Sequence, residues 1–236
     1  MVNQVVTISF FRFKTLKNKF WAFTMMQAAQ KQLAAVPNQP NFYKFLGSGG
    51  KDGFSWKPNF SVYGLLCVWD DESTAREFFQ NSEIYKNYVA RSVEHCSIYL
   101  KASKSHGSWS KVNPFIEQEN LDTNGKVAIL TRATIRFSKL YSFWRRVAGV
   151  SRSLENYGGR QFSIGIGEWP WIQQATFSIW DSEEQMIEYA YKNPIHKKII
   201  QLTREKRWYR EEMFVRFRTI KADGRWGGVA LSHLGT

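Results

Sequence analysis

Residues 180–203 read W-D-S-E-E-Q-M-I-E-Y-A-Y-K-N-P-I-H-K-K-I-I-Q-L-T, and this stretch decides how the chain folds. It predicts a helix that stops near Lys192 and restarts at Asn193 and Pro194, because asparagine is a good N-cap and proline fits the first helical position. The restart places His196 in the first turn of a second helix. Apolar side chains recur beside it at helical spacing, namely Ile195, Ile199 and Leu202. His196 therefore borders the face that this helix buries.

The same pattern occurs earlier in the chain. Residues 68–86, V-W-D-D-E-S-T-A-R-E-F-F-Q-N-S-E-I-Y-K, align without a gap with residues 179–197. In this alignment Tyr85 falls opposite His196. Because two copies of one unit differ here, with a phenol in one and an imidazole in the other, we predict that only the second copy carries a ligand or a catalytic group.

Both halves of the chain show the same order of elements. In the first half, periodicity predicts strands over 4–13, 41–46, 60–69 and 95–101, and helices over 16–35 and 71–92, the latter broken near residue 82. In the second half it predicts strands over 127–137, 160–169, 173–180 and 212–220, a helix over 139–157, and a broken helix that ends near residue 207. Each half reads β-α-β-β-α-β, which is the ferredoxin-like unit. We expect an α+β protein in which two tandem ferredoxin-like repeats form a dimeric α+β barrel within one chain, with a cavity between the sheets.

Turn-forming residues separate the two halves. Segment 102–125 contains G-S-W-S, N-P and N-G, which predicts a linker. The expected division is an N-terminal repeat over 1–101, this linker, a C-terminal repeat over 126–221 that carries the candidate ligand, and a tail over 222–236.

Composition limits the classes of protein that fit. The 236 residues include two cysteines, Cys67 and Cys96, which are too few for a disulfide framework and lack metal-site spacing, so a reducing, cytoplasmic setting is expected. No apolar run reaches the roughly 18 residues that a membrane span needs, and the first residues lack the layout of a signal peptide, so we expect a soluble protein. A net charge of +13 favours an acidic partner, and 16% aromatic residues favour an aromatic-walled cavity.

Strand alternation predicts which side chains face the barrel, because successive side chains point to opposite sides. In strand 127–137 the face assigned to the interior carries Leu130, Arg132, Thr134 and Arg136, and in strand 173–180 it carries Gln174, Thr176, Ser178 and Trp180. Guanidiniums inside a barrel are costly unless they are paired or bound to an anion, so an anionic ligand such as a propionate is expected. The alternative is an internal polar network in which the arginines pair with glutamates, the candidates being Glu168, Glu211 and Glu212.

Several of these segments resemble one known family. They are L-T-R-A-T-I-R-F (130–137), G-I-G-E-W-P (165–170), Q-A-T-F-S-I-W-D-S (174–182), A-Y-K-N-P-I-H (190–196) and W-Y-R-E-E-M-F-V-R-F (208–217), with G-L-L-C-V-W-D-D (64–71) and G-S-W-S (107–110) in the first half. In these motifs the chain is similar to the spheroidene monooxygenase family of carotenoid ketolases. The likeness covers nearly the whole chain in the same order.

The resemblance implies a haem b-dependent monooxygenase that introduces a keto group at the end of an acyclic carotenoid, using O₂ and a reduced ferredoxin-type electron donor. It also implies kinship with haem-containing dimeric α+β barrels, such as aldoxime dehydratases and chlorite dismutases, in which a helix histidine is the proximal iron ligand. His196 matches the family's A-Y-x-x-x-x-H pattern and is the expected axial ligand. The other histidines fit less well, since His95 lies at a strand start, His106 in the linker and His233 in the tail.

The resemblance also assigns roles to residues of the two strands. Arg132 and Arg136 are expected to anchor a haem propionate or to donate to bound oxygen, and Thr176 or Ser178 to supply a distal hydroxyl. The expected catalytic residues are thus Arg132, Thr176 and Ser178. Trp180 joins the two arginines and His196 in the expected haem site.

The partners follow from the same reasoning. The substrate is a lipophilic carotenoid, and the positive charge would help the enzyme to meet an acidic electron donor or an anionic membrane, so a peripheral contact with the inner membrane is compatible with a cytoplasmic protein. Three rivals remain: a cofactor-free oxygenase on the same fold, a non-catalytic haem- or carotenoid-binding barrel, and an RNA-binding module. No R-G-F-G-F-V-type signature occurs, so we expect no nucleic-acid partner.

Overall fold

A computed structural model of the chain describes residues 3–36, 38–50, 57–122, 125–147 and 158–235, and the side chains of residues 147, 195 and 196 lie outside this description. The first half contains β1 (Val5–Arg12), α1 (Leu16–Leu33), β2 (Phe42–Gly49), β3 (Pro58–Trp69), α2 (Glu72–Asn81), α3 (Glu83–Arg91) and β4 (Glu94–Gly107). The second half contains β5 (Val127–Ile135), a short 3₁₀ turn η1 (Phe137–Lys139), α4 (Leu140–Val147), β6 (Arg160–Trp169), β7 (Gln173–Trp180), α6 (Glu183–Lys192), α7 (Pro194–Lys206) and β8 (Tyr209–Trp226). The chain closes with β9 (Val229–Ala230) and η2 (Ser232–Leu234).

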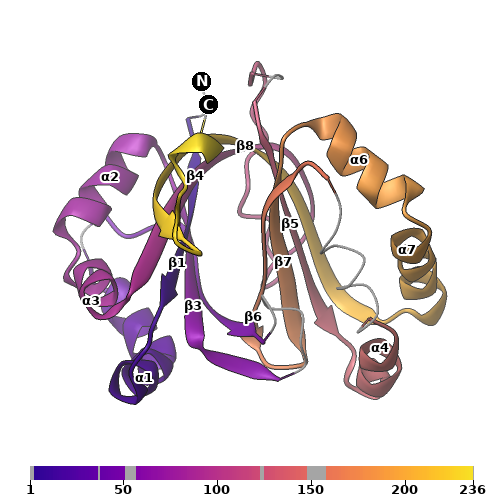
Figure 1. The fold of residues 1–236 in the computed structure, drawn as a ribbon, viewed down its shortest axis with the longest axis horizontal. Coiled ribbons are helices and arrows are strands. Elements are labelled where there is room, and N and C mark those ends of the chain that lie inside the picture. The colour runs from indigo at the N-terminus through magenta and orange to yellow at the C-terminus, as the bar shows by residue number, and fades with distance from the viewer. Residues whose placement is uncertain (1–2, 37, 51–56, 123–124, 148–157, 236) are drawn as a thin grey trace.

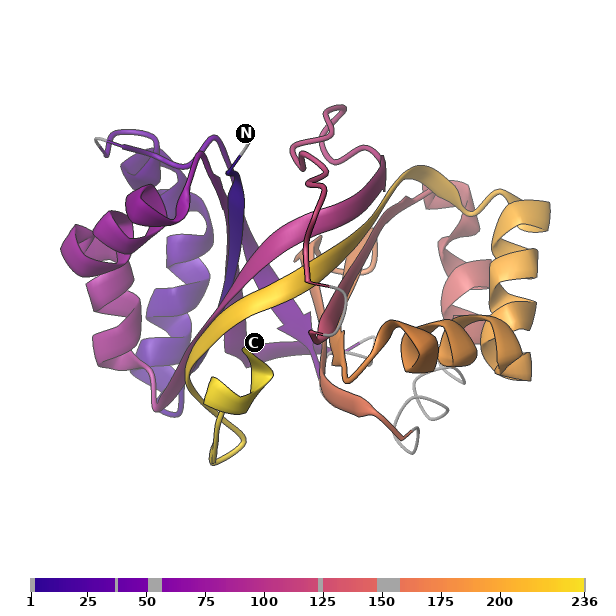
Figure 2. The same cartoon turned by 90° about the horizontal axis from the view of Figure 1, so that it is seen from above.

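The strands form one antiparallel barrel, as the sequence predicts. The sheet order is β4-β1-β3-β2-β6-β7-β5-β8-β9, and an additional pairing of β4 with β8 closes the ring. Each half therefore contributes a ferredoxin-like sheet, ordered β4-β1-β3-β2 in the first and β8-β5-β7-β6 in the second. Figures 1 and 2 show the two sheets face to face, with α1, α2 and α3 outside one of them and α4, α6 and α7 outside the other.

The two seams between the halves differ in length. Strands β4 and β8 pair from Cys96 and Gly224 to Gly107 and Met213, whereas β2 and β6 pair only at Gly47 with Gly167 and at Ser48 with Ile166. The long seam needs strands that extend past the expected boundaries at residues 101 and 221, because β4 reaches Gly107 and β8 reaches Trp226. The short seam therefore joins the halves through far fewer residue pairs than the long seam.

The helix break that the sequence predicts is present in both halves. Ser82 separates α2 from α3, and its side chain accepts a hydrogen bond from the backbone amide of Tyr85. Asn193 separates α6 from α7 in the second half, and Pro194 is the first residue of α7. Polar N-caps and a proline at the first helical position are local signals, so both breaks can be predicted from sequence.

The barrel interior is filled with side chains. Phe10, Phe162 and Phe177 pack together with ring centroids 5.5–6.1 Å apart, and Trp226 contacts the first of them. Buried residues of β1, β3, β5, β7 and β8 belong to the same cluster. The prediction of a cavity between the sheets is therefore wrong for the part of the barrel that the structure describes, because bulky apolar residues from both halves meet there.

The outer faces of the two sheets are covered differently. On the first half, one continuous cluster of buried residues lies between the sheet and α1, α2 and α3. On the second half, the described residues form two smaller clusters, one around Trp180 and Tyr189 and one around Phe143 and Trp208. Among the described residues, no helix is both long and apolar enough to span a membrane.

Candidate functional site

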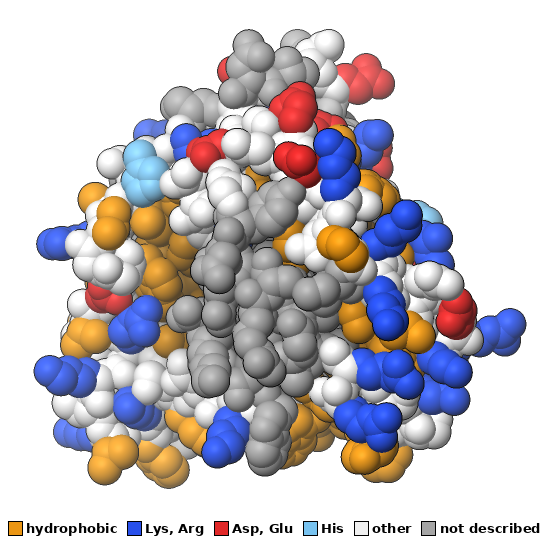
Figure 3. Space-filling view, turned by 45° about the vertical axis from the view of Figure 1, so that its right-hand side comes forward, with side chains coloured by type: hydrophobic (Ala, Val, Ile, Leu, Met, Phe, Trp, Pro, Cys, Tyr) orange, Lys and Arg blue, Asp and Glu red, His pale blue; other side chains and the backbone are white. Residues whose placement is uncertain are grey.

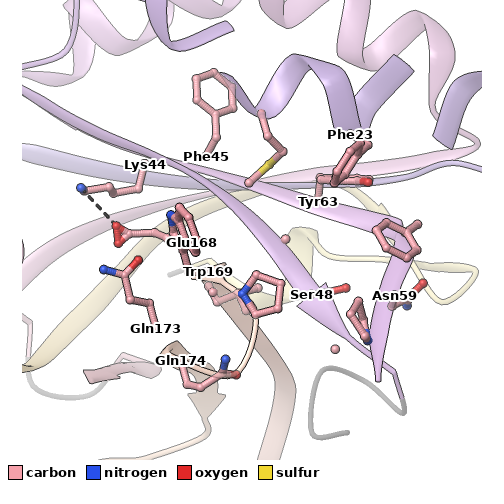
Figure 4. A pocket seen from close by; sticks show the side chains of 18 of the residues that line it. Phe23, Lys44, Phe45, Ser48, Asn59, Tyr63, Glu168, Trp169, Gln173 and Gln174 are labelled. Atoms are coloured by element: carbon pink, nitrogen blue, oxygen red, sulfur yellow. Dashed lines mark ion pairs between the residues drawn. The ribbon is translucent and has the colours of Figure 1, made fainter. Parts of the chain in front are cut away.

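A groove of about 930 Å³ lies beside the short seam. Helix α1 forms one wall, β2 and the start of β3 form the next, and the turn between β6 and β7 forms the opposite side (Figure 4). Aromatic side chains come from every wall: Phe23, Tyr43, Phe45, Phe60, Tyr63, Trp144, Trp169 and Trp171. Its size and lining are typical of a small-molecule site.

One end of the groove is polar. The ammonium group of Lys44 lies 3.2 Å from a carboxylate oxygen of Glu168, and Figure 4 shows this pair beside Gln173 and Gln174. The rest of the lining is mainly apolar or aromatic. The groove can therefore hold an elongated apolar molecule with a polar group at one end.

Behind Glu168 lies a buried ion network. Arg132 is 2% exposed; one of its terminal nitrogens bonds to Glu211 and the other lies 3.4 Å from Glu168. The indole nitrogen of Trp109 donates to Glu168 at 2.8 Å, and the guanidinium lies 5.6 Å from the Trp109 ring centroid. Arg132 thus points into the barrel as predicted, and its charge is matched by the predicted partners Glu168 and Glu211. This geometry fits the internal-network alternative for Arg132.

The carboxyl group of Glu211 is held in its charged form. Burial by itself would raise its pKa, but hydrogen bonds from the Lys111 backbone amide and from Arg132 outweigh burial, and the pKa lies below the ordinary value. Ser108 adds another hydrogen bond. The negative charge of Glu211 is therefore a fixed part of this network at neutral pH.

Arg136 lies outside the barrel, which corrects the prediction that it points inward. Its side chain is exposed, and Nε donates to the backbone oxygen of Tyr209 at 3.1 Å. Strand β5 ends at Ile135, so strand alternation no longer applies at the next residue.

Thr176, Ser178 and Trp180 also face away from the barrel interior, contrary to the prediction. The alternate residues Ala175, Phe177 and Ile179 belong to the interior cluster. Trp180 instead stacks on Tyr189 of α6 with 5.2 Å between ring centroids, and its indole nitrogen donates to Ser178 at 2.9 Å. The apolar residues of β7 fill the interior, and its polar residues lie on the side covered by helices.

Thr176 and Ser178 lie among further hydroxyl groups on the outer face of the second sheet. Thr131 is exposed although it lies in the middle of β5, and it pairs with the half-buried Thr176. Ser163 pairs with Ser178 in the next row, and its buried hydroxyl has no hydrogen-bond partner among the described residues. Small polar side chains thus occupy two adjacent rows of this face.

The first half shows what the same face looks like when it is packed. The repeat aligns Thr176 with Leu65 and Ser178 with Cys67, and both of these counterparts are buried in the outer cluster of the first sheet. Burial raises the pKa of the Cys67 thiol well above its ordinary value, as expected for an inert packing residue. At these two positions the second half carries hydroxyl groups where the first half carries buried packing residues.

His196 belongs to α7, but its side chain lies outside the described residues. Its counterpart Tyr85 is described: the ring contacts Phe79 at 4.6 Å between centroids, and the hydroxyl lies 3.0 Å from Ser97 Oγ. Tyr85 therefore packs on the outer face of the first sheet. Among the described residues, no group of three or more His, Cys, Asp or Glu side chains could hold a metal ion. A haem needs only one protein ligand, so the absence of such a group among the described residues does not bear on a haem site.

Sequence reasoning missed two arginines on this face. Arg216 and Arg218 of β8 both bond to Glu183 at the start of α6, the second at 3.0 Å. Arg216 pairs with Ile129, in the same row as Ser178. Two guanidiniums share one carboxylate, which leaves a net positive charge beside the hydroxyl rows. Alternation along 209–226 carries this signal, since both residues fall on the side of β8 that faces the helices.

Gln174 connects the groove with the hydroxyl rows. It lines the groove and precedes Thr176 by two residues on β7, so both side chains lie on the same side of the strand. Trp144 of α4 also lines the groove, and its indole nitrogen donates to the backbone oxygen of Trp171 at 3.0 Å. The groove therefore reaches Gln174, two residues before Thr176 on the same side of β7.

Three known proteins are similar to this chain over most of its length. The spheroidene monooxygenase of Rhodobacter capsulatus is 34% identical over 226 residues, which cover 95% of this chain and 93% of that protein. The spheroidene monooxygenase of Cereibacter sphaeroides is likewise 34% identical, with 95% of this chain and 69% of that protein covered, and that of Rubrivivax gelatinosus is 32% identical over 89% of this chain.

Two solved structures share the fold at much lower identity. An aldoxime dehydratase is similar over 92% of this chain and 82% of its own, with a TM-score of 0.58 at 9% identity, and an aldoxime dehydratase complex with butyraldoxime gives 0.59 at 10% identity over 92% and 80%. No protein-family model matches the chain. The identity to the three enzymes extends over almost the whole sequence, and on that basis the chain belongs to the spheroidene monooxygenase family and is an oxidoreductase.

Proposed function

We propose that this oxidoreductase introduces a keto group at the end of an acyclic carotenoid, with haem b as its cofactor, O₂ as the oxidant and a reduced ferredoxin-type protein as the electron donor. The relatives are named spheroidene monooxygenases, which supports a carotenoid substrate and a monooxygenase reaction. The further details come from the family resemblance and from the shape of the site.

One observation carries the proposal: an aromatic groove of about 930 Å³ reaches Gln174, two residues before Thr176 on the same side of β7. A polyene is long, apolar and flat, and flat aromatic side chains bind such a molecule through dispersion and burial of apolar area. The end of the polyene would reach the rows of Thr176 and Ser178 past Gln174. Most of the chain of the substrate is then held in the groove while one end meets the cofactor.

The repeat supports a place for the cofactor. Tyr85 lies on the outer face of the first sheet, and His196 is the matching residue of α7, so His196 is the residue that would hold a haem on the outer face of the second sheet. We propose Arg216, in place of Arg132 and Arg136, as the partner of a propionate, because it lies on this face in the same row as Ser178, with Ile129 between them. Haem, when bound, would supply the activation of O₂.

The remaining steps belong to the protein. Each turnover inserts one oxygen atom of O₂ into a C–H bond and releases the other as water, with two electrons from the donor and two protons from solvent. The first turnover gives an alcohol, and a second turnover at the same carbon gives a geminal diol that loses water to form the keto group. Thr131, Thr176 and Ser178 offer hydroxyl groups that can donate hydrogen bonds and pass protons toward the site. The aromatic groove keeps water from the rest of the polyene, which confines oxidation to the end that protrudes.

Conversion of the substrate tests the proposal. The protein is loaded with haem and given an acyclic carotenoid, O₂ and a reduced ferredoxin-type donor. A conjugated keto group extends the chromophore, so the carotenoid absorption should shift to longer wavelength, with O₂ consumed only when donor and haem are present. Absence of product with haem bound would contradict the proposal.

A second result would identify the cofactor-free rival. If protein that contains no haem converts the carotenoid as fast as the loaded protein, the reaction is that of a cofactor-free oxygenase on this fold. Carotenoid binding without oxygen uptake under any condition would instead indicate a non-catalytic binding barrel.

A further inference from the structure

Exposed apolar side chains gather at one end of the molecule. Helix α1 carries Leu16, Phe20 and Phe23, which are 84%, 71% and 54% exposed. Their spacing places all three on one side of the helix, opposite the buried Ala22, Ala29 and Leu33. A helix with one apolar stripe toward the core and a second toward solvent is unusual for a soluble surface, and the outward stripe needs a partner.

The stripe continues across the mouth of the groove. Phe23 contacts Phe60 edge to face at 5.7 Å, and both line the groove with the exposed Trp169 and Trp171. Figure 1 places α1, α4 and the ends of β3 and β6 at the same end of the barrel. Figure 3 shows hydrophobic side chains along this lower edge with Lys and Arg side chains near them. On the other side of the mouth, Phe137 and Tyr141 are 81% and 78% exposed.

The charge of this end has one sign along its helices. Helix α1 contains no Asp or Glu, and Lys17 and Lys19 lie on either side of its exposed stripe. The stretch 137–147, which covers η1 and α4, also contains no acidic residue and carries Lys139, Arg145 and Arg146. Aromatic residues combined with lysine and arginine are the pattern of a helix that lies in the interface of an anionic membrane.

We infer that this end, named here the aromatic end and defined by Leu16, Phe20, Phe60, Trp169 and Tyr141, seats on an anionic lipid bilayer. The partner is lipid and not a protein, because the apolar residues surround the mouth of a groove that is itself apolar. A substrate dissolved in the bilayer then enters the groove without crossing water. The entry of substrate from the bilayer rests on the proposed function, whereas the binding of the protein to the membrane does not.

Vesicle binding tests the inference without catalysis. The whole protein is sedimented with carotenoid-free vesicles of phosphatidylcholine, with or without phosphatidylglycerol. We expect binding to the anionic vesicles that weakens as salt is raised, and weak binding to the neutral ones. The double variant Leu16→Ser/Phe20→Ser, called the stripe variant below, should bind at least about tenfold more weakly, because each side chain contributes apolar area to the contact. Neither residue lines the groove.

Matched controls separate this surface from general stickiness. Tyr191→Ser/Val229→Ser removes exposed side chains from other faces, 68% and 58% exposed, and should bind vesicles like the wild type. The double variant Lys17→Glu/Lys19→Glu should lose binding to anionic vesicles, and its weak binding to neutral vesicles should not change. Equal binding by the stripe variant and the wild type, or no binding by the wild type at low salt, would overturn the inference. A third result would also overturn it: if the stripe variant is a monomer where the wild type is a dimer, and vesicle binding is unchanged, the surface joins two copies of the chain.

Activity provides an independent readout. The stripe variant should convert carotenoid in detergent micelles at the wild-type rate and carotenoid in vesicles several-fold more slowly. If no protein converts the substrate in either form, the proposed function fails while vesicle binding still decides the membrane inference. Slower conversion in micelles by the stripe variant would mean that its side chains act on the groove and would contradict a role in membrane seating.

Discussion

At the residue scale, the most constrained side chain of the site is Arg132. It is the one guanidinium that the described residues enclose almost completely, and two carboxylates share its charge. Removing one partner of a buried ion pair leaves the other charge without compensation. Arg132 therefore holds together the strands β5, β6 and β8 behind the polar end of the groove.

Replacing the guanidinium of Arg132 should lower the stability of the protein. We predict that Arg132→Leu lowers the free energy of unfolding by about 3 kcal/mol, measured by urea denaturation, because Glu168 and Glu211 lose their shared partner. Arg136→Leu is the control: that side chain is exposed, so its change should stay within about 0.5 kcal/mol. Similar values for the two variants would show that the network is not structural.

Glu211 gives the network a pH dependence. Its pKa in the folded protein is lower than in the unfolded chain, so its contribution to stability is present above the unfolded pKa and is lost as pH falls through the folded pKa. We predict that the stability difference between wild type and Glu211→Gln shrinks as pH is lowered from about 6 to about 3. Urea denaturation at each pH measures it, and a difference that stays constant across this range would be against the assignment.

At the element scale, the short seam between β2 and β6 decides where the groove lies. Its two glycines pair with each other but have different surroundings. A Cβ on Gly167 would lie 2.2 Å from the backbone oxygen of Gln173, whereas a Cβ on Gly47 would have no neighbour nearer than 3.8 Å. Gly167 is thus needed for the close approach of β6 and β7 at the end of the groove.

These two glycines make a matched pair of substitutions. We predict that Gly167→Ala lowers the free energy of unfolding by about 1–3 kcal/mol and weakens carotenoid binding, because the backbone of β7 must move away. Gly47→Ala should bind carotenoid like the wild type. Fluorescence quenching of the groove tryptophans can report binding, and equal binding by both variants would mean that the turn is not part of the site.

The outer face of the second sheet can be tested by copying the first. In the double variant Thr176→Leu/Ser178→Cys, each residue takes the identity of its counterpart in the first half, where both are buried. We predict that this variant folds with unchanged or higher stability and loses haem binding, because a larger apolar side chain at position 176 would occupy the face on which we propose the haem. Retained haem absorption in a folded variant would place the cofactor elsewhere.

Sequence reasoning predicted the elements well and the faces of the strands less well. The helix breaks at Ser82 and Asn193 depend on capping by neighbouring residues, so they can be predicted from the sequence. The direction of Thr176 and Ser178 depends on which side of β7 meets the apolar interior, and both sides carry some apolar residues. The groove depends on how briefly β2 pairs with β6, two strands far apart in the sequence, and no local pattern encodes that length.

At the scale of the whole molecule, duplication explains why the two halves differ. Both contribute a sheet to one barrel, and their shared interior is filled by apolar side chains from each. The first half packs its outer face and the second leaves hydroxyl groups there, with α7 above the sheet where the first half has α3. The first half thus packs its outer face, and the outer face of the second half is where we propose the cofactor site.

The absorption spectrum of the haem-loaded protein tests the central claim most directly. The wild type and the control His106→Ala, whose imidazole is exposed, should show the same spectrum of imidazole-ligated haem. His196→Ala should lose that spectrum, and added imidazole should restore it. An unchanged spectrum in His196→Ala, with the protein folded and haem bound, would contradict the account.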